Sequence, residues 1–499
     1  MGAPPLVSMR GISKAFGPVQ ACASVDLTVH AGDILGLLGE NGAGKTTLMN
    51  ILFGTYAADE GAIEVEGRPV SIRSSHDALK LGIGMVHQHF HLVPRHTVLE
   101  NLLVGRAGPD GRLTRRTVIE RLAAIGRDFH IRLDPARLVS DLSIGEQQRV
   151  EIAKALVRGA RILVLDEPTA TLTPQETEGL FAALRAMTAR GMGVIFISHK
   201  LAEVLEITNR ITVMRQGRVV AERENKQGLS KGELARLMCG RELSPPERPA
   251  QEAGLPLLKL TGVSAPGLKD VSLTLRAGEI VGIAGVSGNG QRSLADVVAG
   301  VLAPTGGAIE LHGEVVTGLT PRFVQAQGVG RVPEDRMAIG MIGALSLSES
   351  MALPWVGGPP FSKRGILDRK AMRKFASDQI DRFDIRTSGP DARTGTLSGG
   401  NLQKALLARE IAHDPKILLA AQPTRGIDVG ATEFIHGQFL DLRAKGGAVL
   451  LISEDLEELF QLSDRIGVMY GGRIVADLAG EEATVERIGL FMAGVEQAA

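Results

Sequence analysis

The chain has 499 residues, of which 44% are hydrophobic and 22% are charged, so it can form two to four domains with substantial cores. Its 56 basic and 56 acidic residues balance and no basic tail is present, which disfavours a general nucleic-acid binder. Two cysteines, Cys22 and Cys239, exclude a framework of disulfides and fit a reduced compartment. The N-terminal residues lack the apolar core of a signal peptide, and no apolar run reaches the roughly 20 residues that span a bilayer.

The first strongly patterned segment is a buried strand, "DILGLLG", followed by a helix over 44–53. Between them, residues 39–46 match G-x-x-x-x-G-K-[ST], whose glycines let backbone N–H groups surround phosphates. The helix N-terminus adds partial positive charge, Lys45 can reach the β- and γ-phosphates, and Thr46 is suited to ligate Mg²⁺. The predicted nucleotide-binding residues of this loop are Gly39, Glu40, Asn41, Gly42, Ala43, Gly44, Lys45, Thr46 and Thr47.

Two features on either side of this loop leave alternatives open. Phe16 is suited to stack on an adenine ring, with packing in the core as an equal alternative. "HQHFH" places His87, His89 and His91 at alternate positions, which suggests a metal site. The metal interpretation is disfavoured because no carboxylate or cysteine stands nearby in the sequence.

Two further apolar runs, "ARILVLDE" and "MGVIFIS", predict strands that flank an amphipathic helix over 175–191. Because these strands are continuously apolar, they predict a parallel sheet that is covered on both faces, and therefore an α/β fold. The intervening residues 88–143 have a mostly helical pattern and are predicted to form a helical sub-domain.

Acidic residues end the run "ARILVLDE", at the edge where open α/β sheets bind ligands. We expect Asp166 to hold Mg²⁺ and Glu167 to act as the general base for an attacking water, rather than the pair merely capping a helix. His199 follows the next strand and is expected to contact the γ-phosphate, with a purely structural role as the alternative.

The second half of the chain repeats the first. "GEIVGIAGVSGNGQRSLADVVAGVL" aligns with "GDILGLLGENGAGKTTLMNILFGTY", and "ILLAAQPT" aligns with "ILVLDEPT". The second copy has nine more residues between Glu334 and Ser398, an interval that corresponds to the helical sub-domain. We therefore predict a domain over 1–243, a linker rich in proline and charge over 244–255, and a second domain over 256–499.

"LSGGN" at 397–401 and "LSIGE" at 142–146 resemble the signature motif of ABC-type ATPases, and with the phosphate loop and "ILVLDEPT" the resemblance spans almost the whole chain. It implies two tandem P-loop domains, each with a mainly parallel sheet, a helical sub-domain and an antiparallel β edge. In that family two domains face head to tail, and each ATP lies between the phosphate loop of one and the signature of the other. Gln88 corresponds to the family's Q-loop glutamine, here also a predicted Mg²⁺ ligand, and His199 to its switch histidine.

Pairing each phosphate loop with the signature of the other half explains which site residues have been replaced. Composite site 1 combines the first phosphate loop, Gln88, Asp166, Glu167 and His199 with residues of the second half: Ser398, Gly399, Gly400 and Asp428. Composite site 2 is degenerate, since the positions of its lysine, Mg²⁺ hydroxyl, two acids, glutamine and histidine are occupied by Gln291, Arg292, Ala421, Gln422, Glu334 and Glu454. Its signature and loop partners are altered too, to Ile144 and Thr173. We therefore predict one catalytic and one degenerate site.

The tandem layout resembles the fused ATPase subunits of bacterial nucleoside or simple-sugar importers. The resemblance implies ATP and Mg²⁺ as cofactors, membrane permease subunits as partners, a periplasmic or lipoprotein solute-binding protein as an indirect partner, and a position at the cytoplasmic face of the membrane. "AAQPT" lacks the acid pair expected in sugar importers and favours the nucleoside type. The alternatives are a soluble ABC ATPase that acts on ribosomes or DNA and a regulatory nucleotide switch without transport.

Overall fold

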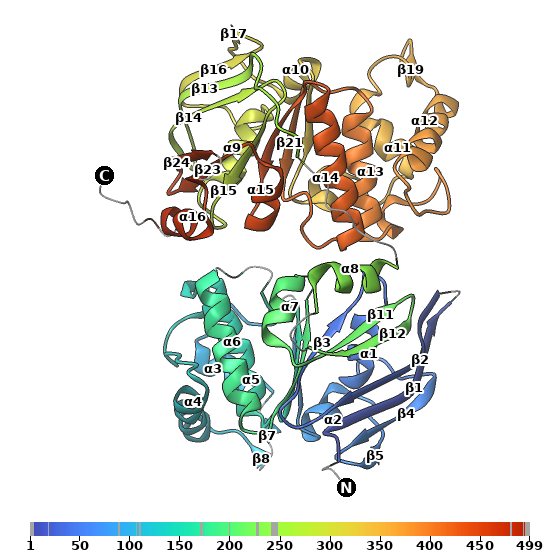
Figure 1. Ribbon diagram of the computed structural model, residues 1–499, viewed down its shortest axis with the longest axis vertical. Helices are drawn as coiled ribbons and strands as arrows, with labels where there is room; N and C mark the ends of the chain where they lie inside the picture. The colour runs from blue at the N-terminus through green and yellow to red at the C-terminus, as the bar shows by residue number, and fades with distance from the viewer. Residues whose placement is uncertain are drawn as a thin grey trace. The chain divides into compact units, whose positions relative to one another are not determined.

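The computed structural model describes residues 4–17, 19–87, 90–105, 107–108, 111–169, 172, 174–198, 200–225, 229–240, 248–479, 482–492 and 494. The internal contacts divide the chain into two units, residues 1–243 and 244–499. Each unit has a mainly parallel six-stranded sheet and a separate four-stranded antiparallel sheet (Figure 1). The α/β fold predicted from the sequence, with its antiparallel edge and helical sub-domain, is confirmed in both units.

In unit 1 the six-stranded sheet has the order β12-β11-β3-β10-β9-β6, and only β12 runs antiparallel to its neighbour. Its strands are β3 (Ile34–Leu38), β6 (Ile83–Val86), β9 (Ile162–Asp166), β10 (Gly193–Ile197), β11 (Arg210–Arg215) and β12 (Arg218–Glu224). The antiparallel sheet, in the order β2-β1-β4-β5, contains β1 (Val7–Phe16), β2 (Val19–Val29), β4 (Glu60–Val65) and β5 (Arg68–Val70).

The helices of unit 1 include one that fixes the phosphate loop. Leu48, Met49 and Leu52 of α1 share a hydrophobic cluster with Leu35 of β3 and Val7 of β1, so α1 packs against both sheets and its first turn follows the end of β3. The helices are α1 (Lys45–Leu52), α2 (Ser75–Lys80), α3 (Val98–Leu103), α4 (Arg115–Phe129), α5 (Ile144–Val157), α6 (Pro174–Thr188), α7 (Leu201–Ile207) and α8 (Lys231–Cys239), with a 3-10 turn η1 (Val139–Asp141) and a hairpin of β7 (Ala107–Gly108) and β8 (Gly111–Arg112).

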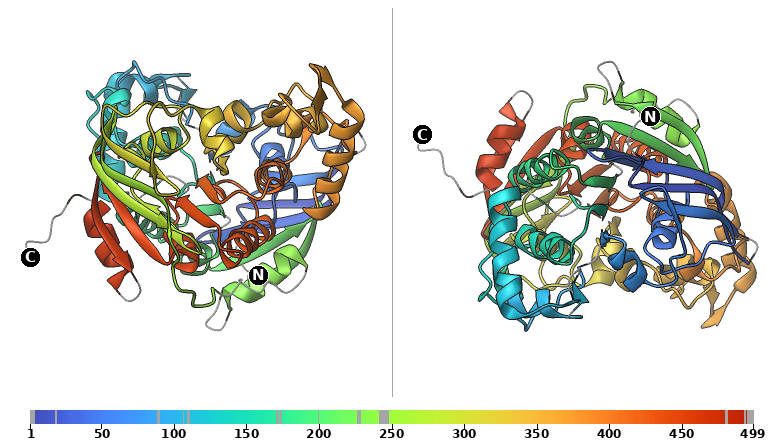
Figure 2. Two further views of the ribbon diagram at one scale, coloured as in Figure 1. Left: turned by 90° about the horizontal axis from the view of Figure 1, so that it is seen from above. Right: turned by 90° about the horizontal axis from the view of Figure 1, so that it is seen from below.

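Unit 2 repeats this plan, with the sheet order β18-β21-β22-β15-β23-β24. These strands are β15 (Ile280–Ala284), β18 (Val329–Val332), β21 (Ile417–Ala421), β22 (Ala448–Ile452), β23 (Arg465–Tyr470) and β24 (Arg473–Ala479). The antiparallel sheet contains β13 (Pro256–Ala265), β14 (Leu268–Arg276), β16 (Gly306–Leu311) and β17 (Glu314–Val315). Within this unit, β13, β14 and β16 lie at one end and α11 and α12 at the other (Figures 1 and 2).

The longer interval between Glu334 and Ser398 accounts for the extra residues of unit 2. It contains a π-helical turn η2 (Arg336–Gly340), a 3-10 turn η3 (Leu353–Trp355), and a hairpin of β19 (Ser362–Lys363) and β20 (Ile366–Leu367) between α11 and α12. The helices of unit 2 are α9 (Gln291–Val298), α10 (Pro321–Ala326), α11 (Leu347–Ala352), α12 (Arg369–Arg382), α13 (Gly399–Ile411), α14 (Val429–Ala444), α15 (Leu456–Leu462) and α16 (Val485–Met492), with a further 3-10 turn η4 (Thr394–Thr396).

Part of the predicted linker is held by unit 2. The buried Arg443 donates to the carbonyl of Pro249 at 3.0 Å and pairs with Asp464 at 2.8 Å, and Arg248 also pairs with Asp464 at 3.2 Å. Residues 248–251 therefore pack on the second unit, while 241–247 lie outside the described residues. Throughout the described part of the chain, no helix combines the length and apolarity needed to cross a membrane.

Candidate functional site

The first phosphate loop, residues 39–46, has the backbone that the motif predicts. Gly39, Gly42 and Gly44 have φ values of 151°, 84° and 101°, in the region that favours glycine. A Cβ on Gly39 would collide with the backbone of Met214, and one on Gly44 with that of Ala21. The loop therefore needs glycine for its turn and for close packing on β2 and β11, and it leads directly into the first turn of α1.

Lys45 folds over this loop. Its Nζ donates to the carbonyl oxygens of Gly39 and Glu40, at 2.6 and 3.0 Å. These contacts hold the ammonium at the mouth of the loop, where a phosphate chain cradled by the loop would accept from it. Thr46 is the second residue of α1, adjacent to the same cradle.

The acidic pair lies at the carboxyl edge of the parallel sheet. Asp166 ends β9 and is paired in register with Ile197 of β10, which in turn is paired with Leu37 of β3. The ends of these strands therefore stand side by side with the strand that leads into the phosphate loop. Glu167 has φ 49°, and its N–H donates to the carbonyl of Ile197 at 2.9 Å, so a hydrogen bond fixes the turn that carries the carboxylate.

The pKa of Asp166 is raised to about 6: burial and the charge of Glu167 raise it, and the charge of Lys45 lowers it. A buried carboxylate beside a second one is a good environment for a divalent cation, because the cation compensates the negative charge. Asp166 and Thr46 thus fit the Mg²⁺ ligand set expected from the sequence. The other expected contacts, Gln88 and His199, lie outside the described residues, after the ends of β6 at Val86 and β10 at Ile197.

Phe16 is not a core residue, since 43% of its surface is exposed. Its ring meets Tyr56 edge to face, with centroids 5.3 Å apart, and Lys14 lies 5.6 Å from its centroid. Sequence reasoning missed Tyr56, although an aromatic residue soon after α1 is visible in "FGTY". An exposed aromatic pair at the end of β1 is a suitable platform for a base.

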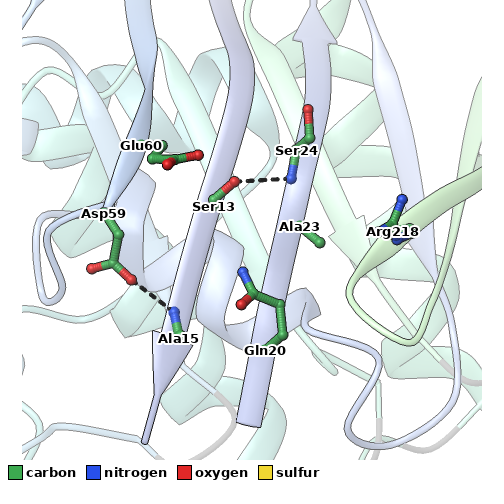
Figure 3. A pocket seen from close by; sticks show the side chains of 8 residues that line it. All are labelled: Ser13, Ala15, Gln20, Ala23, Ser24, Asp59, Glu60 and Arg218. Atoms are coloured by element: carbon green, nitrogen blue, oxygen red, sulfur yellow. Dashed lines mark hydrogen bonds between the residues drawn. The ribbon is translucent and has the colours of Figure 1, made fainter. Parts of the chain in front are cut away.

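A pocket of about 390 Å³ borders the strand that carries Phe16 (Figure 3). Asp59 on its wall accepts from Lys14 Nζ at 2.7 Å and from the N–H of Ala15 at 2.8 Å, which lowers the pKa of its carboxyl. Ser13 accepts from the N–H of Ser24 at 3.0 Å across the same pocket. These contacts fix the end of β1, and none of the predicted phosphate-binding residues lines this pocket.

The second phosphate loop, residues 285–292, resembles the first loop in backbone conformation and has the neutral Gln291 in place of Lys45. Gly290 has φ 108°, and Gln291 donates from Nε2 to the carbonyl of Val286 at 2.9 Å, as Lys45 donates within the first loop. Gln422 repeats the φ of 49° and the backbone bond of Glu167, here to Ile452 at 2.8 Å. At these two places in unit 2 the backbone of unit 1 is repeated, and the side chains differ.

The second signature, residues 397–401, begins α13. Ser398 caps this helix and accepts from Asn401 Nδ2 at 2.8 Å. Asp428 caps α14, accepting from the N–H of Ala431 at 2.8 Å, and a Cβ on Gly400 would lie 3.3 Å from its Oδ2. The four residues predicted to complete composite site 1 from the second half are therefore neighbours within unit 2.

The first signature, residues 142–146, has a carboxylate against it. Ser143 caps α5 in a capping box with Glu146, and its Oγ donates to Glu176 Oε1 at 3.3 Å. The Glu176 carboxylate fills the space that a Cβ on Gly145 would take. At the corresponding place unit 2 has Ala431. Sequence reasoning missed Glu176, because a single glutamate in an exposed helical pattern carries no signal.

The family model described as ABC transporter matches residues 22–170 and 268–425. A glucose import ATP-binding protein of Haloferax volcanii is 43% identical over 98% of this chain and 96% of its own. A guanosine import ATP-binding protein of Bacillus subtilis is 42% identical, over 99% and 98%, and a ribose import ATP-binding protein of Yersinia pestis is 41% identical, over 99% and 97%.

Among solved structures, one titled RNase-L Inhibitor covers 98% of this chain and 93% of its own with a TM-score of 0.64. A complex of an archaeal ribosome recycling factor covers 97% and 92% with a TM-score of 0.62. These chains are 21% and 20% identical to this one, so the likeness shows the fold alone.

Proposed function

The chain belongs to the ABC transporter family, whose ATP-binding proteins are ATPases, and on that premise we propose that it hydrolyses ATP at one composite site to drive import of a nucleoside or simple sugar. The observation that carries this proposal is the distribution of chemistry between the halves. Unit 1 has the lysine, the threonine and both acids, and unit 2 has the glycine signature and Asp428. The residues that unit 2 lacks are those that only composite site 2 would need.

In composite site 1, the first phosphate loop and Lys45 hold the phosphates, and Phe16 stacks on the adenine ring. Thr46, Gln88 and Asp166 would hold Mg²⁺, which would compensate the charge of the β- and γ-phosphates. Glu167 accepts a proton from the attacking water, and His199 contacts the γ-phosphate. Ser398, Gly399 and Gly400 donate to the γ-phosphate, and Asp428 belongs to the same trans surface.

The partners are membrane permease subunits, which place the chain at the cytoplasmic face of the membrane, with a solute-binding protein as an indirect partner. The names of the similar chains support an importer, because all three are import ATP-binding proteins that match over nearly their full length. They include glucose, ribose and guanosine importers, so the class of solute extends over simple sugars and nucleosides. A ribosome-acting ATPase is less well supported, because that likeness reaches only 20% identity.

The test is a solute-stimulated ATPase measurement on the chain copurified with its permease subunits and reconstituted in vesicles. Nucleosides and simple sugars are supplied with the solute-binding protein, and Lys45→Ala is the control for hydrolysis by contaminants. We expect stimulation by one solute class and its loss in the variant. A chain that hydrolyses ATP, copurifies with no membrane protein and responds to no solute would contradict the importer assignment.

A further inference from the structure

We propose that Arg336 is a further catalytic residue beside the second signature, its guanidinium contacting the γ-phosphate that this signature binds. The inference rests on the proposed function, because it needs the second signature to serve the catalytic site. It is carried by the position of Arg336 against the signature, by the absence of a carboxylate partner, and by the opposite arrangement in unit 1.

Arg336 begins the π-helical turn η2, immediately after Asp335. The Asp335 carboxylate is engaged by the backbone, accepting from the N–H groups of Met337 and Ala338 at 3.0 and 2.8 Å. The Arg336 guanidinium instead donates to the carbonyls of Arg425 and Gly426, at 2.9 and 3.4 Å. Two main-chain bonds therefore fix the side chain on the loop that leads to Asp428.

The same guanidinium lies against the second signature. A Cβ on Gly399 would be 2.9 Å from Arg336 Nη2, so the absence of a side chain at Gly399 is what lets the cation approach the first turn of α13. The N-terminus of a helix carries partial positive charge, so a cation placed there is repelled unless an anion is present. A phosphate oxygen between the guanidinium and the signature would be attracted by both.

Nearby arginines of unit 2 form ion pairs with carboxylates, whereas within the described residues no carboxylate oxygen lies at ion-pair distance from Arg336. Burial lowers the pKa of Arg336, the charge of the adjacent Asp335 raises it and the charge of Arg425 lowers it, and the net shift is downward. In contrast, the following pairs form close by: Arg425–Glu334 at 2.6 Å, Arg409–Glu410 at 2.8 Å and Arg331–Asp296 at 2.5 Å.

Unit 1 has no cation at the equivalent position and has a carboxylate against its signature. The residue that aligns with Arg336 is Phe90, and the carboxylate of Glu176 covers the first signature. An anionic ligand would be repelled by that carboxylate, whereas the second signature presents a cation. The cation therefore accompanies the one signature that the proposed function assigns to catalysis.

A guanidinium suits this task because its planar N–H groups match phosphate oxygens and remain charged after partial burial. It forms no covalent bond and moves no proton. It stabilises the charge that develops on the γ-phosphoryl group as the bond to the β-phosphate breaks, a contribution that reaches about 10³-fold or more in other phosphoryl-transfer enzymes.

The experiment compares kcat and KM for Mg-ATP in the complex of the full chain with its permease subunits. Arg336→Ala should lower kcat by about 10²-fold or more, and Arg336→Lys should recover part of the loss. Arg373→Ala is the matched control, because Arg373 pairs with Asp391 on the exposed face of α12, and it should retain kcat within about twofold. Ser398→Ala is measured in the same assay as a test of the composite site itself.

A second readout separates phosphate contact from support of the loop. In a Glu167→Gln background, ATP should raise the melting temperature more than ADP does, and Arg336→Ala should remove most of that difference without lowering the nucleotide-free melting temperature. A lower nucleotide-free melting temperature with the ATP–ADP difference intact would overturn the inference in favour of loop support.

The two proposals fail in distinguishable ways. If Ser398→Ala loses activity and Arg336→Ala does not, the role of Arg336 is wrong and the composite site stands. If neither variant affects hydrolysis, the composite site itself is wrong, and the inference fails with it.

Discussion

The two signature helices begin alike and meet opposite charges. Both α5 and α13 start at a serine cap with a glycine two residues later, yet Glu176 lies on the first and Arg336 on the second. The two phosphate loops show the complementary difference, since the first has Lys45 and the second has the neutral Gln291. At these loops and helix starts the duplicated scaffold has been retained while charge has been redistributed, so their asymmetry lies in side-chain chemistry.

The largest expected effect comes from exchanging the residues that follow β9 and β21. Glu167→Gln should lower kcat by about 10³-fold or more and preserve ATP binding, because it removes the proton acceptor without changing shape. The reverse exchange, Gln422→Glu, should leave kcat within about twofold. Steady-state ATPase and nucleotide-binding assays check both.

This exchange is well matched, because both residues have φ 49° and make the same backbone hydrogen bond. Substantial turnover in Glu167→Gln would count against its assignment as the base. A large change in Gln422→Glu would show that the second phosphate loop takes part in hydrolysis.

The next effect concerns the two serine caps. Ser398→Ala should lower kcat by about 10²–10³-fold, the usual result of removing one preorganised donor to developing charge. Ser143→Ala should cost far less, because its hydroxyl is already bound to Glu176 within unit 1. The measurement is steady-state ATPase, with thermal melts to exclude unfolding.

Serines are a better pair for this comparison than the glycines beside them. A side chain at Gly145 would displace the Glu176 carboxylate, whereas one at Gly400 would meet Ala431 and Asp428, so the two glycine substitutions differ in local strain. If Ser143→Ala proves the more damaging of the two serine variants, the active signature has been assigned to the wrong half.

The chain should bind one nucleotide, which is half the number expected if both composite sites were intact. The Glu167→Gln protein should retain one Mg-ATP per chain, because composite site 2 has neither the lysine charge nor the acid pair. Equilibrium dialysis with labelled ATP measures the ratio. Two tightly bound Mg-ATP molecules per chain would remove the distinction between the two sites.

The smallest effect is on stability and depends on pH. The pKa of Asp166 is about 6 in the folded protein and 3.8 for an ordinary aspartate, so the folded state binds this proton more tightly than the unfolded chain. Ionised Asp166 therefore costs about 3 kcal/mol of stability above pH 6, and this cost disappears as the pH falls through 6 towards 4.

Asp166→Asn should accordingly raise the melting temperature of the nucleotide-free protein at pH 8, and the gain should shrink between pH 6 and pH 4. Ala421→Asp, at the equivalent buried position of unit 2, should lower the melting temperature at pH 8 and less so at pH 5. Calorimetric melts across this pH range provide the measurement. A gain in Asp166→Asn that does not vary with pH would show that ionisation of Asp166 is not the cause.

Much of the fold was predictable because its signals are local. The runs "DILGLLG", "ARILVLDE" and "MGVIFIS" each contain a continuous apolar stretch, which predicts a sheet covered on both faces, and the structure has them as β3, β9 and β10. The glycine pattern likewise predicts the loop before α1, since positive φ values and close backbone approaches exclude side chains at Gly39 and Gly44. The sequence also showed that the replaced site residues all belong to one of the two composite sites, although the functional meaning of this pattern came from the family resemblance.

Other features depend on contacts between distant segments, which no periodicity encodes. The placement of Arg336 against Gly399 joins residues 63 positions apart, and that of Glu176 against Ser143 joins residues 33 apart. The sequence by itself determined the α/β units, the phosphate loop and the residues that carry the chemistry, because these follow from backbone sterics and from burial along single elements. Only the tertiary structure decided the exposure of Phe16, the raised pKa of Asp166 and the charge at each signature, because electrostatic environment is set by what folding brings nearby and removes from water.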